Sequence, residues 1–258
     1  MDVFPDSLLQ RYRPDWIIGR GRSGVVWAVT DLETGRALAM KFLELSVLAH
    51  GWPRHAHLVE VVTQPRWDLL AMERVRGTAL RDWPLPGRSL PVAKAASLLL
   101  PMLDAVRVLH EAGIAHGGLH GGNVMVRGPG DPVLMEPMTG RVPVLGAAPE
   151  ILCGEVPHAG SDVWALGVLA HVLLTGAAPH PGAPEAMRRM ILEEPLAAPG
   201  IVNPKLPRSL EAWLLRALAR SAARRFADAR EMLGALRAAL AELPPSADAM
   251  PPAAYRPA

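Results

Sequence analysis

The chain has 258 residues, 50% hydrophobic and 20% charged, so it can bury a large core in one big domain or in two lobes. Its net charge of +2 and its scattered basic residues argue against nucleic-acid binding, and its single cysteine, Cys153, excludes an internal disulfide. There is no signal-peptide pattern and no run of about 20 apolar residues, so we expect a cytoplasmic protein without a membrane span. The excess of Ala, Arg, Pro and Leu is typical of a GC-rich genome and favours a bacterial source.

Residues 16–29 contain two apolar runs joined by Gly19, Gly21 and Gly24. This pattern predicts a β-hairpin whose turn is a G-x-G-x-x-G-x-V loop. The same glycine spacing occurs in dinucleotide-binding folds, but there the glycines open a helix, whereas a second β-branched run follows here. Glycines of this kind let a backbone approach phosphate groups.

Residues 36–43 predict the next strand, with Lys41 flanked on both sides by apolar residues. Burying an ammonium group is costly unless an anion meets it, which favours a lysine that faces a phosphate. The alternative is an edge strand whose lysine extends its charge into solvent. Only 13 residues separate Lys41 from His55, which leaves room for at most about two helical turns, and Glu44 is the only acid among them.

A further strand is predicted over residues 67–80, followed by a proline-rich loop. Residues 92–112 have apolar positions at helical spacing, and Gly113 is placed to end that helix. The helix leads into the sequence HGGLHGGNVMV at residues 116–126, a glycine-rich loop before a short apolar strand. Further helices are predicted over residues 161–174, 183–193, 208–220 and 226–241, with Asp162 as the cap of the first.

These motifs together resemble the eukaryotic-like Ser/Thr protein kinase family. The loop from His116 to Asn123 matches the family's H-R-D-L-x-x-x-N, the strand with Lys41 matches V-A-I-K, residues 148–150 match A-P-E, and residues 161–169 match the D-V-W-S-L-G helix. The resemblance also implies that Arg225 pairs with the acid of A-P-E.

The resemblance implies an α+β, protein-kinase-like two-lobed fold. It combines a small antiparallel-sheet N-lobe, whose αC helix is shortened or missing, with a helical C-lobe. The expected boundaries are residues 1–75 for the N-lobe, 76–241 for the C-lobe and 242–258 for a Pro/Ala-rich tail that is disordered or a linker.

A nucleotide site between the lobes is also implied. In this interpretation the glycine loop and Lys41 face the phosphates, Met72 is the gatekeeper, and the backbone of Glu73 and Val75 contacts the adenine. The implied cofactor-binding residues are Ile18, Gly19, Gly21, Gly24, Val26, Ala39, Lys41, Met72, Glu73, Val75 and Met125.

The sequence departs from the family pattern at positions that carry the chemistry. Gly118 stands where the catalytic Asp belongs, and glycine has no group that accepts a proton. Glu136 replaces the metal-binding Asp of D-F-G, and its extra methylene shifts the oxygens in a site that needs near-ideal geometry at about 2.0–2.1 Å. We therefore expect Mg²⁺ binding by Asn123 and Glu136 to be weak or absent. Glu44 is too close to Lys41 in sequence to form the activating ion pair in the usual way.

His120 occupies the position of the lysine that steadies the transferred phosphate in the family. It is either a phosphate contact or base, or a polar loop side chain that faces solvent. The latter is the simpler interpretation, and no catalytic residue is expected among His116, Gly118, His120 and Asn123.

The sequence therefore predicts a pseudokinase, a binding, scaffolding or allosteric regulatory module that docks to a protein partner and binds ATP weakly. The alternative is an active ATP-dependent Ser/Thr kinase, or another phospho- or nucleotidyl-transferase, in which His120, Glu136 and Asn123 replace the lost Asp.

Overall fold

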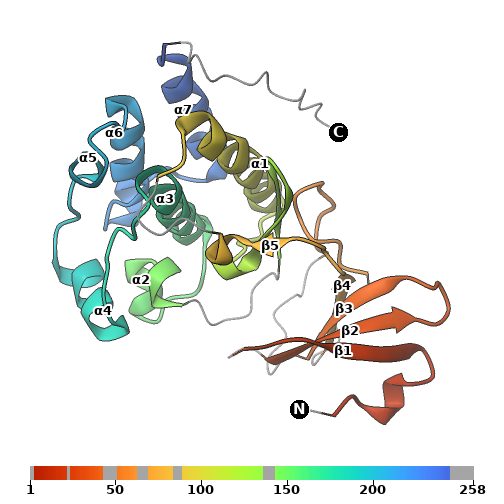
Figure 1. Ribbon diagram of the computed structural model, residues 1–258. Helices are drawn as coiled ribbons and strands as arrows, with labels where there is room; N and C mark the ends of the chain where they lie inside the picture. Colours follow the sequence, from red (N-terminus) through yellow and green to blue (C-terminus); the bar gives the residue numbers. More distant parts are fainter. Residues whose placement is uncertain are drawn as a thin grey trace.

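The structure is a computed structural model that describes residues 3–21, 24–42, 51–62, 69–83, 89–135 and 143–244. Within these residues a four-stranded sheet lies beside a mostly helical lobe that carries a second, smaller sheet (Figure 1). The strands are β1 (Tyr12–Gly21), β2 (Gly24–Asp31), β3 (Ala37–Phe42), β4 (Leu69–Glu73), β5 (Thr78–Ala79), β6 (Val124–Gly128) and β7 (Asp131–Leu134). The α-helices are α1 (Val92–Glu111), α2 (Pro149–Leu152), α3 (Ala159–Thr175), α4 (Pro184–Glu193), α5 (Pro199–Val202), α6 (Arg208–Ala217) and α7 (Ala229–Ala241).

The N-lobe sheet has the order β1-β2-β3-β4, and each strand is antiparallel to its neighbour. Side chains of adjacent residues alternate between its two faces. One face holds an apolar cluster that includes Leu38 and Met40, and Phe4 covers it from the N-terminal segment. The ring of Phe4 meets those of Trp27 and Phe42 edge-on at 5.6 and 5.7 Å. The strands predicted within residues 16–29 and 36–43 are confirmed. The strand predicted over residues 67–80 is divided: Leu69–Glu73 forms β4 of this sheet, whereas Thr78–Ala79 forms β5 of the second sheet.

The turn between β1 and β2 places Gly21 opposite Gly24. Gly24 has a φ of 121°, and a Cβ there would lie 2.0 Å from the carbonyl oxygen of Phe42. A side chain at Gly24 would therefore clash with β3, whether or not a phosphate is ever bound. At Gly19, by contrast, an added Cβ would meet nothing within 4 Å.

Residues 57–62 connect the two sheets. The N–H of Val62 donates to the carbonyl of Ala71 in β4 at 2.9 Å, and the N–H of Val59 donates to the carbonyl of Leu134 in β7 at 2.9 Å. This one segment therefore fixes the position of the N-lobe sheet against the C-lobe. The predicted shortening of the αC helix falls on residues 43–50, which lie outside the described residues; residues 51–62 contain no α-helix.

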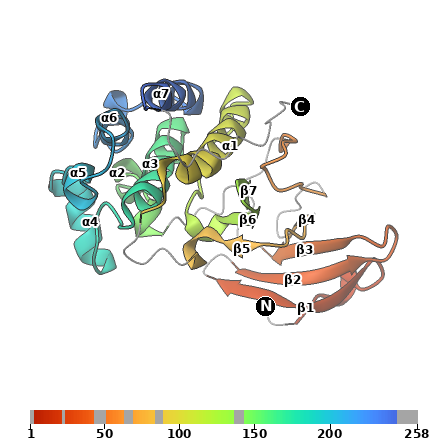
Figure 2. The same cartoon turned by 45° about the horizontal axis from the view of Figure 1, so that its top comes forward.

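The C-lobe core forms where α1, α3, α6 and α7 pack together beside β6 and β7 (Figure 2). Nearly every residue of α3 is buried, as its all-round apolar sequence predicts. The predicted helices at 183–193, 208–220 and 226–241 correspond to α4, α6 and α7. The short helix α5 was not predicted. No α-helix in the described residues is both long and apolar enough to cross a membrane.

The start of α3 differs from the prediction that Asp162 caps it. His158 is the N-cap: its Nδ1 accepts a hydrogen bond from the N–H of Gly160 at 3.0 Å, and its own N–H donates to Oγ of Ser161 at 2.9 Å. Asp162 lies a full turn inside the helix, too far along to accept from the first-turn amides. Its carboxylate is directed instead at the loop that follows α1.

Candidate functional site

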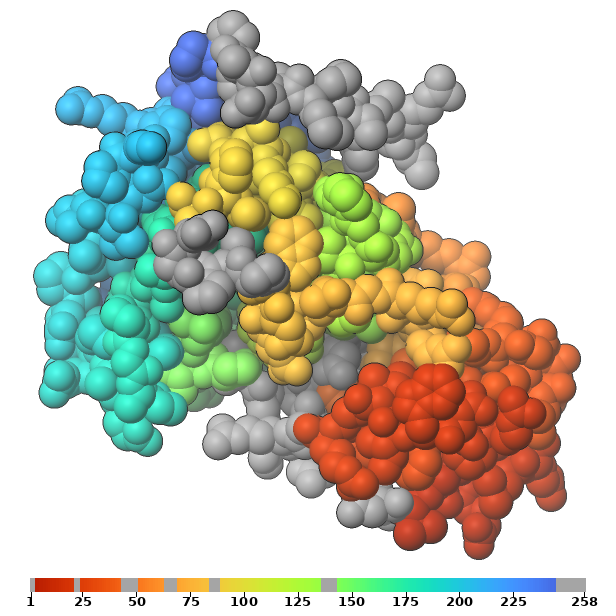
Figure 3. All heavy atoms as spheres, in the orientation of Figure 1, coloured from red at the N-terminus to blue at the C-terminus, as the bar shows by residue number. Residues whose placement is uncertain are grey.

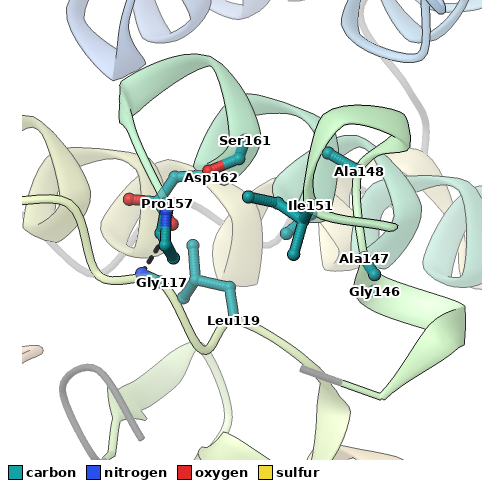
Figure 4. Close-up of a pocket in the computed structure, with 10 residues that line it drawn as sticks. Gly117, Leu119, Gly146, Ala147, Ala148, Ile151, Pro157, Ser161 and Asp162 are labelled. Carbon is teal, nitrogen blue, oxygen red and sulfur yellow. Dashed lines mark hydrogen bonds between the residues drawn. The ribbon is translucent and has the colours of Figure 1, made fainter. Parts of the chain in front are cut away.

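The loop of residues 116–123 lies between α1 and β6, and Asp162 fixes its backbone. The Asp162 carboxylate accepts hydrogen bonds from the N–H groups of His116 at 2.6 Å and Gly117 at 2.9 Å, the second drawn in Figure 4. His110 Nε2 lies 3.1 Å from the same carboxylate, while His110 Nδ1 accepts from the N–H of Ala229 at the start of α7. Asp162 is 1% exposed, so these are strong interactions in a low-dielectric interior. The local sequence of α3 carries no sign of this contact.

A small cavity beside this anchor is shown in Figure 4, between the loop, α2 and the start of α3. Leu119, Ile151 and Pro157 are among the residues that line it. Its volume is about 10 Å³, room for no more than one water molecule. It is a packing gap and not a ligand site.

Gly118 lies at the centre of the loop and is buried. Its carbonyl accepts a hydrogen bond from Nδ2 of Asn123 at 2.9 Å, and its N–H donates to Nδ1 of His116 at 3.3 Å. The structure thus brings His116, Gly118 and Asn123 together as predicted. Hydrogen bonds hold the backbone of the loop at His116, Gly117 and Gly118, but glycine leaves the position of the family's catalytic carboxylate without a side chain.

His120 is half-buried next to three basic side chains. Burial lowers the pKa of His120 to about 4, and the charges of His116, Arg81 and Lys41 add to that effect. Its Nδ1 accepts a hydrogen bond from the N–H of Gly122 at 3.0 Å, so the single proton of the neutral ring is on Nε2. His120 is therefore a neutral hydrogen-bond donor at neutral pH, and its partial burial is compatible with both interpretations of its role.

Gly121 and Gly122 allow the loop to approach residues 80–82. A Cβ on Gly121 would lie 3.1 Å from the backbone nitrogen of Arg81, and one on Gly122 would lie 2.9 Å from both Nη1 of Arg81 and Cε1 of His120. Gly121 thus packs closely against the backbone of the segment that joins the two lobes, whereas Gly122 faces the movable end of the Arg81 side chain. The described part of that segment, up to residue 83, lies in the orange-to-yellow stretch of Figure 3.

The predicted adenine slot is an apolar cluster on the C-lobe side of the N-lobe sheet. Ala39 and Met72 are at its centre with exposures of 4% and 2%, and Val26 and Val75 pack against it. Four of the predicted side chains are therefore brought together. The cluster also has members that were missed: the buried Val59, Leu70 and Val133 and the partly buried Val61 and Met135. Strand alternation in residues 131–135 could have indicated Val133 and Met135.

The remaining predicted nucleotide contacts are spread around this cluster. Ile18 is 48% exposed on β1, and Met125 lies on β6 opposite Ala79, outside the described members of the slot. The N–H of Glu73 donates to the carbonyl of Glu60 at 2.8 Å, so an adenine could meet only its carbonyl.

Lys41 lies on β3 between Val26 of β2 and Leu70 of β4, and it is 1% exposed. Its charge lowers the pKa of His120, which places the ammonium near the catalytic-loop position. Its predicted ion-pair candidate, Glu44, lies outside the described residues, so the loss of that pair stays a prediction. A buried lysine at this place fits an anion-facing role better than the edge-strand alternative.

The predicted metal ligands are Asn123 and Glu136, of which only Asn123 is described. Its Nδ2 is occupied by the carbonyl of Gly118, which leaves Oδ1 as the atom suited to a metal. No group of three or more His, Cys, Asp or Glu side chains close enough to hold a metal occurs among the described residues. Mg²⁺ needs an octahedral set of oxygens and favours carboxylates, and the predicted carboxylate, Glu136, lies outside the described residues, so weak or absent Mg²⁺ binding stays a prediction.

The ion pair predicted between the A-P-E acid and Arg225 is present. Nη1 and Nη2 of Arg225 donate to the two oxygens of Glu150 at 2.7 and 2.8 Å, across 75 residues of sequence. The guanidinium also donates to the carbonyl of Gly160 and lies 5.0 Å from the ring of Trp164. This contact ties α2 to the core of the C-lobe.

Comparison with known proteins finds relatives across most of the chain, although no family model matches. The chain is 28% identical over 267 residues to "Probable serine/threonine-protein kinase PknB" of Corynebacterium glutamicum, covering 87% of this chain and 41% of that protein. It is 30% identical over 257 residues to serine/threonine-protein kinase PkaB of Streptomyces coelicolor, covering 83% of this chain and 60% of that protein. The chain thus spans about two fifths to three fifths of the length of these relatives.

A solved structure supports the same fold. The kinase Rad53, crystallised as residues 1–466 with AMP-PNP, matches with a TM-score of 0.75 and 19% identity over 89% of this chain and 66% of that one. At this identity the match concerns the fold, and it agrees with the sheet-rich lobe and the helical lobe described above. The buried Lys41, the anchored loop and the pair Glu150–Arg225 lie where the family motifs require them. The chain belongs to the eukaryotic-like Ser/Thr protein kinase family.

Proposed function

We propose that this chain is a pseudokinase domain that acts as a binding, scaffolding or regulatory module and not as a phosphoryl transferase. The observation that carries the proposal is Gly118, at the place where the family's catalytic Asp accepts the proton of the substrate hydroxyl. The loop around it is held in place by Asp162 and Asn123. The missing carboxylate is therefore a local loss of chemistry in a folded loop.

Neighbouring groups are poor substitutes for that carboxylate. A general base works best with a pKa near the operating pH, whereas the pKa of His120 is about 4 and its Nδ1 is already engaged. Asp162 is buried and its oxygens accept from His116 and Gly117. This supports the non-catalytic function over the alternative, an active kinase or other transferase that uses His120, Glu136 and Asn123.

We expect phosphoryl transfer to be absent or marginal. In a radiolabelled-ATP assay with Mg²⁺ or Mn²⁺ and a general protein acceptor, turnover should be at least about a thousandfold below the roughly 1–100 s⁻¹ of protein kinases. Gly118→Asp alone should not restore it, because Glu136 still stands in the metal-binding position. Steady turnover by the unmodified protein that Asn123→Ala or Lys41→Ala abolishes would contradict the proposal.

Nucleotide binding should be weak and largely independent of Mg²⁺. The apolar slot around Ala39 and Met72 and the buried Lys41 favour binding, whereas Glu136 in place of the metal-binding Asp removes much of the metal's contribution. The low exposure of the slot means that a nucleotide must first separate packed side chains. We expect dissociation constants of tens of micromolar or poorer, about −6 kcal/mol.

A thermal-shift titration with ATP, with and without Mg²⁺, measures this. The shift should be small, nearly the same in both conditions, and reduced by Ala39→Trp, which fills the slot. Ile201→Trp, on an exposed surface of α5, serves as the matched control. A large shift that requires Mg²⁺ would indicate a working metal site and favour the enzyme alternative.

A partner protein is the expected ligand of the module. The relatives are longer than this chain, so the docking function is proposed for the kinase-like region alone. Affinity capture with the purified chain, compared with a Gly24→Val variant that disrupts the N-lobe turn, tests whether the folded domain is what the partner recognises.

A further inference from the structure

A second cavity lies in the C-lobe, apart from the adenine slot. It has a volume of about 210 Å³ and is bounded by the segment after β5, the catalytic-loop position, residues 145–146 and one face of α3. The side chains that form its apolar wall are Leu80, Trp83, Leu119, Leu145, Val168, Leu169, Val172 and Leu173. None of the described slot residues around Ala39 and Met72 lines it.

Among the described residues, the segment before α1 that faces this side of α3 is short. Residues Leu80–Asp82 form a single 3₁₀ turn, which reaches the loop at Gly121 but leaves the face with Val168, Leu169 and Val172 bordering open volume. A full helix there would cover these side chains. An apolar, partly enclosed volume of this size can hold a ligand, since an engineered cavity of about 150 Å³ binds benzene.

One end of the cavity is polar and carries positive charge. Arg81 and His120 both line the cavity, and both lie against the neighbouring Gly122, where an added Cβ would be 2.9 Å from Nη1 of Arg81 and 2.9 Å from Cε1 of His120. His120 offers Nε2–H as a donor because Nδ1 accepts from the N–H of Gly122. At the rim, Nζ of Lys94 is 5.6 Å from the ring of Trp83. Opposing these, Asp82 lies 3.5 Å from Nε of Arg81 but is 60% exposed, which weakens the pair.

We propose that this cavity binds a small amphipathic carboxylate, with its apolar body against α3 and its carboxylate between Arg81 and Nε2–H of His120. The volume fits a body of roughly ten heavy atoms, by comparison with benzene in the smaller engineered cavity. A guanidinium and a neutral N–H donor suit a singly charged carboxylate, whose two oxygens can take one hydrogen bond from each. This site is additional to the proposed pseudokinase function and does not require nucleotide.

The direct test is a titration of the purified chain with phenylpropanoate, by calorimetry and by ligand-observed NMR. Two comparison compounds separate the parts of the ligand: phenylpropanol keeps the apolar body without the charge, and succinate keeps the charge without the body. Phenylpropanoate should bind with a Kd of about 0.1–1 mM. Phenylpropanol should bind about tenfold more weakly, and succinate should show no binding.

Two variants locate the site. Val172→Phe fills the cavity from α3 and should abolish binding, and Arg81→Gln removes the charge and should weaken phenylpropanoate about tenfold without affecting phenylpropanol. Arg81 is 67% exposed, so Arg81→Gln keeps the test valid even if Val172→Phe does not fold. Ile201→Phe, at a position 76% exposed on α5 and away from the cavity lining, is the matched control and should bind normally.

Several results of these binding experiments would contradict the proposed carboxylate site. Equal binding by Arg81→Gln and the unmodified chain, equal affinity for phenylpropanol and phenylpropanoate, or no binding of phenylpropanoate at millimolar concentration would each overturn it. Saturating ATP should leave the affinity for phenylpropanoate unchanged. Competition between the two would mean that the compound occupies the nucleotide slot, and it would overturn the proposal without bearing on the loss of phosphoryl transfer.

Discussion

Replacing Arg225 with methionine should destabilise the protein by about 3–5 kcal/mol, the range for breaking a buried ion pair from one side. The Arg225 side chain is fully buried, and it donates to both oxygens of Glu150 and to the carbonyls of Gly160 and Ala219. Methionine of similar length leaves the Glu150 carboxylate without its partner. For a chain of this size the melting temperature should fall by about 10 °C, as measured by circular dichroism and urea unfolding.

The control for this prediction is Arg36→Met, which removes a solvent-exposed pair with Glu60 at 2.7 Å. Because both of its side chains are more than one third exposed, the loss should be below about 1 kcal/mol. Equal losses for Arg225→Met and Arg36→Met would contradict the prediction. A double variant with Glu150→Gln should recover part of the loss, since the unpaired charge is then gone.

The ion pair between Glu150 and Arg225 also predicts that the stability of the fold depends on pH. Burial raises the pKa of Glu150, but the hydrogen bond and charge of Arg225, a backbone hydrogen bond and the charge of His158 outweigh burial and lower it below the usual 4.5. A carboxylate whose folded-state pKa is lowered stabilises the fold fully above its unfolded-state pKa, and this contribution is lost as the pH falls through the folded-state value. The difference in stability between the parent and Arg225→Met should therefore be largest at neutral pH and shrink below about pH 4.5.

Asp162→Asn should cost about 3 kcal/mol and release the loop at residues 116–118. The substitution replaces one acceptor oxygen with an NH₂ donor, which then faces the N–H of His116 or Gly117 or the imidazole N–H of His110. A buried donor left without an acceptor costs about 1–3 kcal/mol, and the lost charge on the remaining hydrogen bonds adds to this. Urea unfolding measures the stability, and amide hydrogen exchange at His116 and Gly117 reports the local release.

Asp82→Asn is the matched control, because this carboxylate is 60% exposed and its replacement should change stability by less than about 0.5 kcal/mol. Faster exchange should be confined to the loop and the start of α7, where His110 meets the N–H of Ala229. Unchanged exchange at His116 and Gly117 in Asp162→Asn would show that other contacts hold the loop.

The order of elements could be predicted from local patterns and from the family resemblance. Runs of β-branched and apolar residues near Val26 and Ala39 predicted strands, and the spacing of residues 92–112 predicted α1. The resemblance supplied one distant contact, Glu150 with Arg225. The family resemblance also indicated that Gly118 replaces a carboxylate, because the residue at a motif position can be identified from the sequence alone.

Other features depended on contacts between distant segments. An Asp near a helix start has the same local pattern whether it caps that helix or accepts from another loop, and only the packing of α1 against α3 directs Asp162 to His116. The role of a glycine in a glycine-rich loop is ambiguous in sequence for the same reason. Gly24 fits a phosphate-facing loop by spacing, but its backbone also approaches the carbonyl oxygen of Phe42 too closely for any side chain.

By itself the sequence determined the family, the succession of strands and helices, and the glycine at the motif position of the family's catalytic Asp, because each is a property of one residue or of a short segment. Only the tertiary structure decided the neutral state of His120, the role of Asp162 and the cavity beside Val172. The apolar sequence of α3 predicts a helix that is buried on every side. The volume of a cavity beside this helix depends instead on the length and path of the segments that cover it. Burial, hydrogen-bond partners and cavities arise from atoms far apart in the chain, and local pattern does not encode their distances.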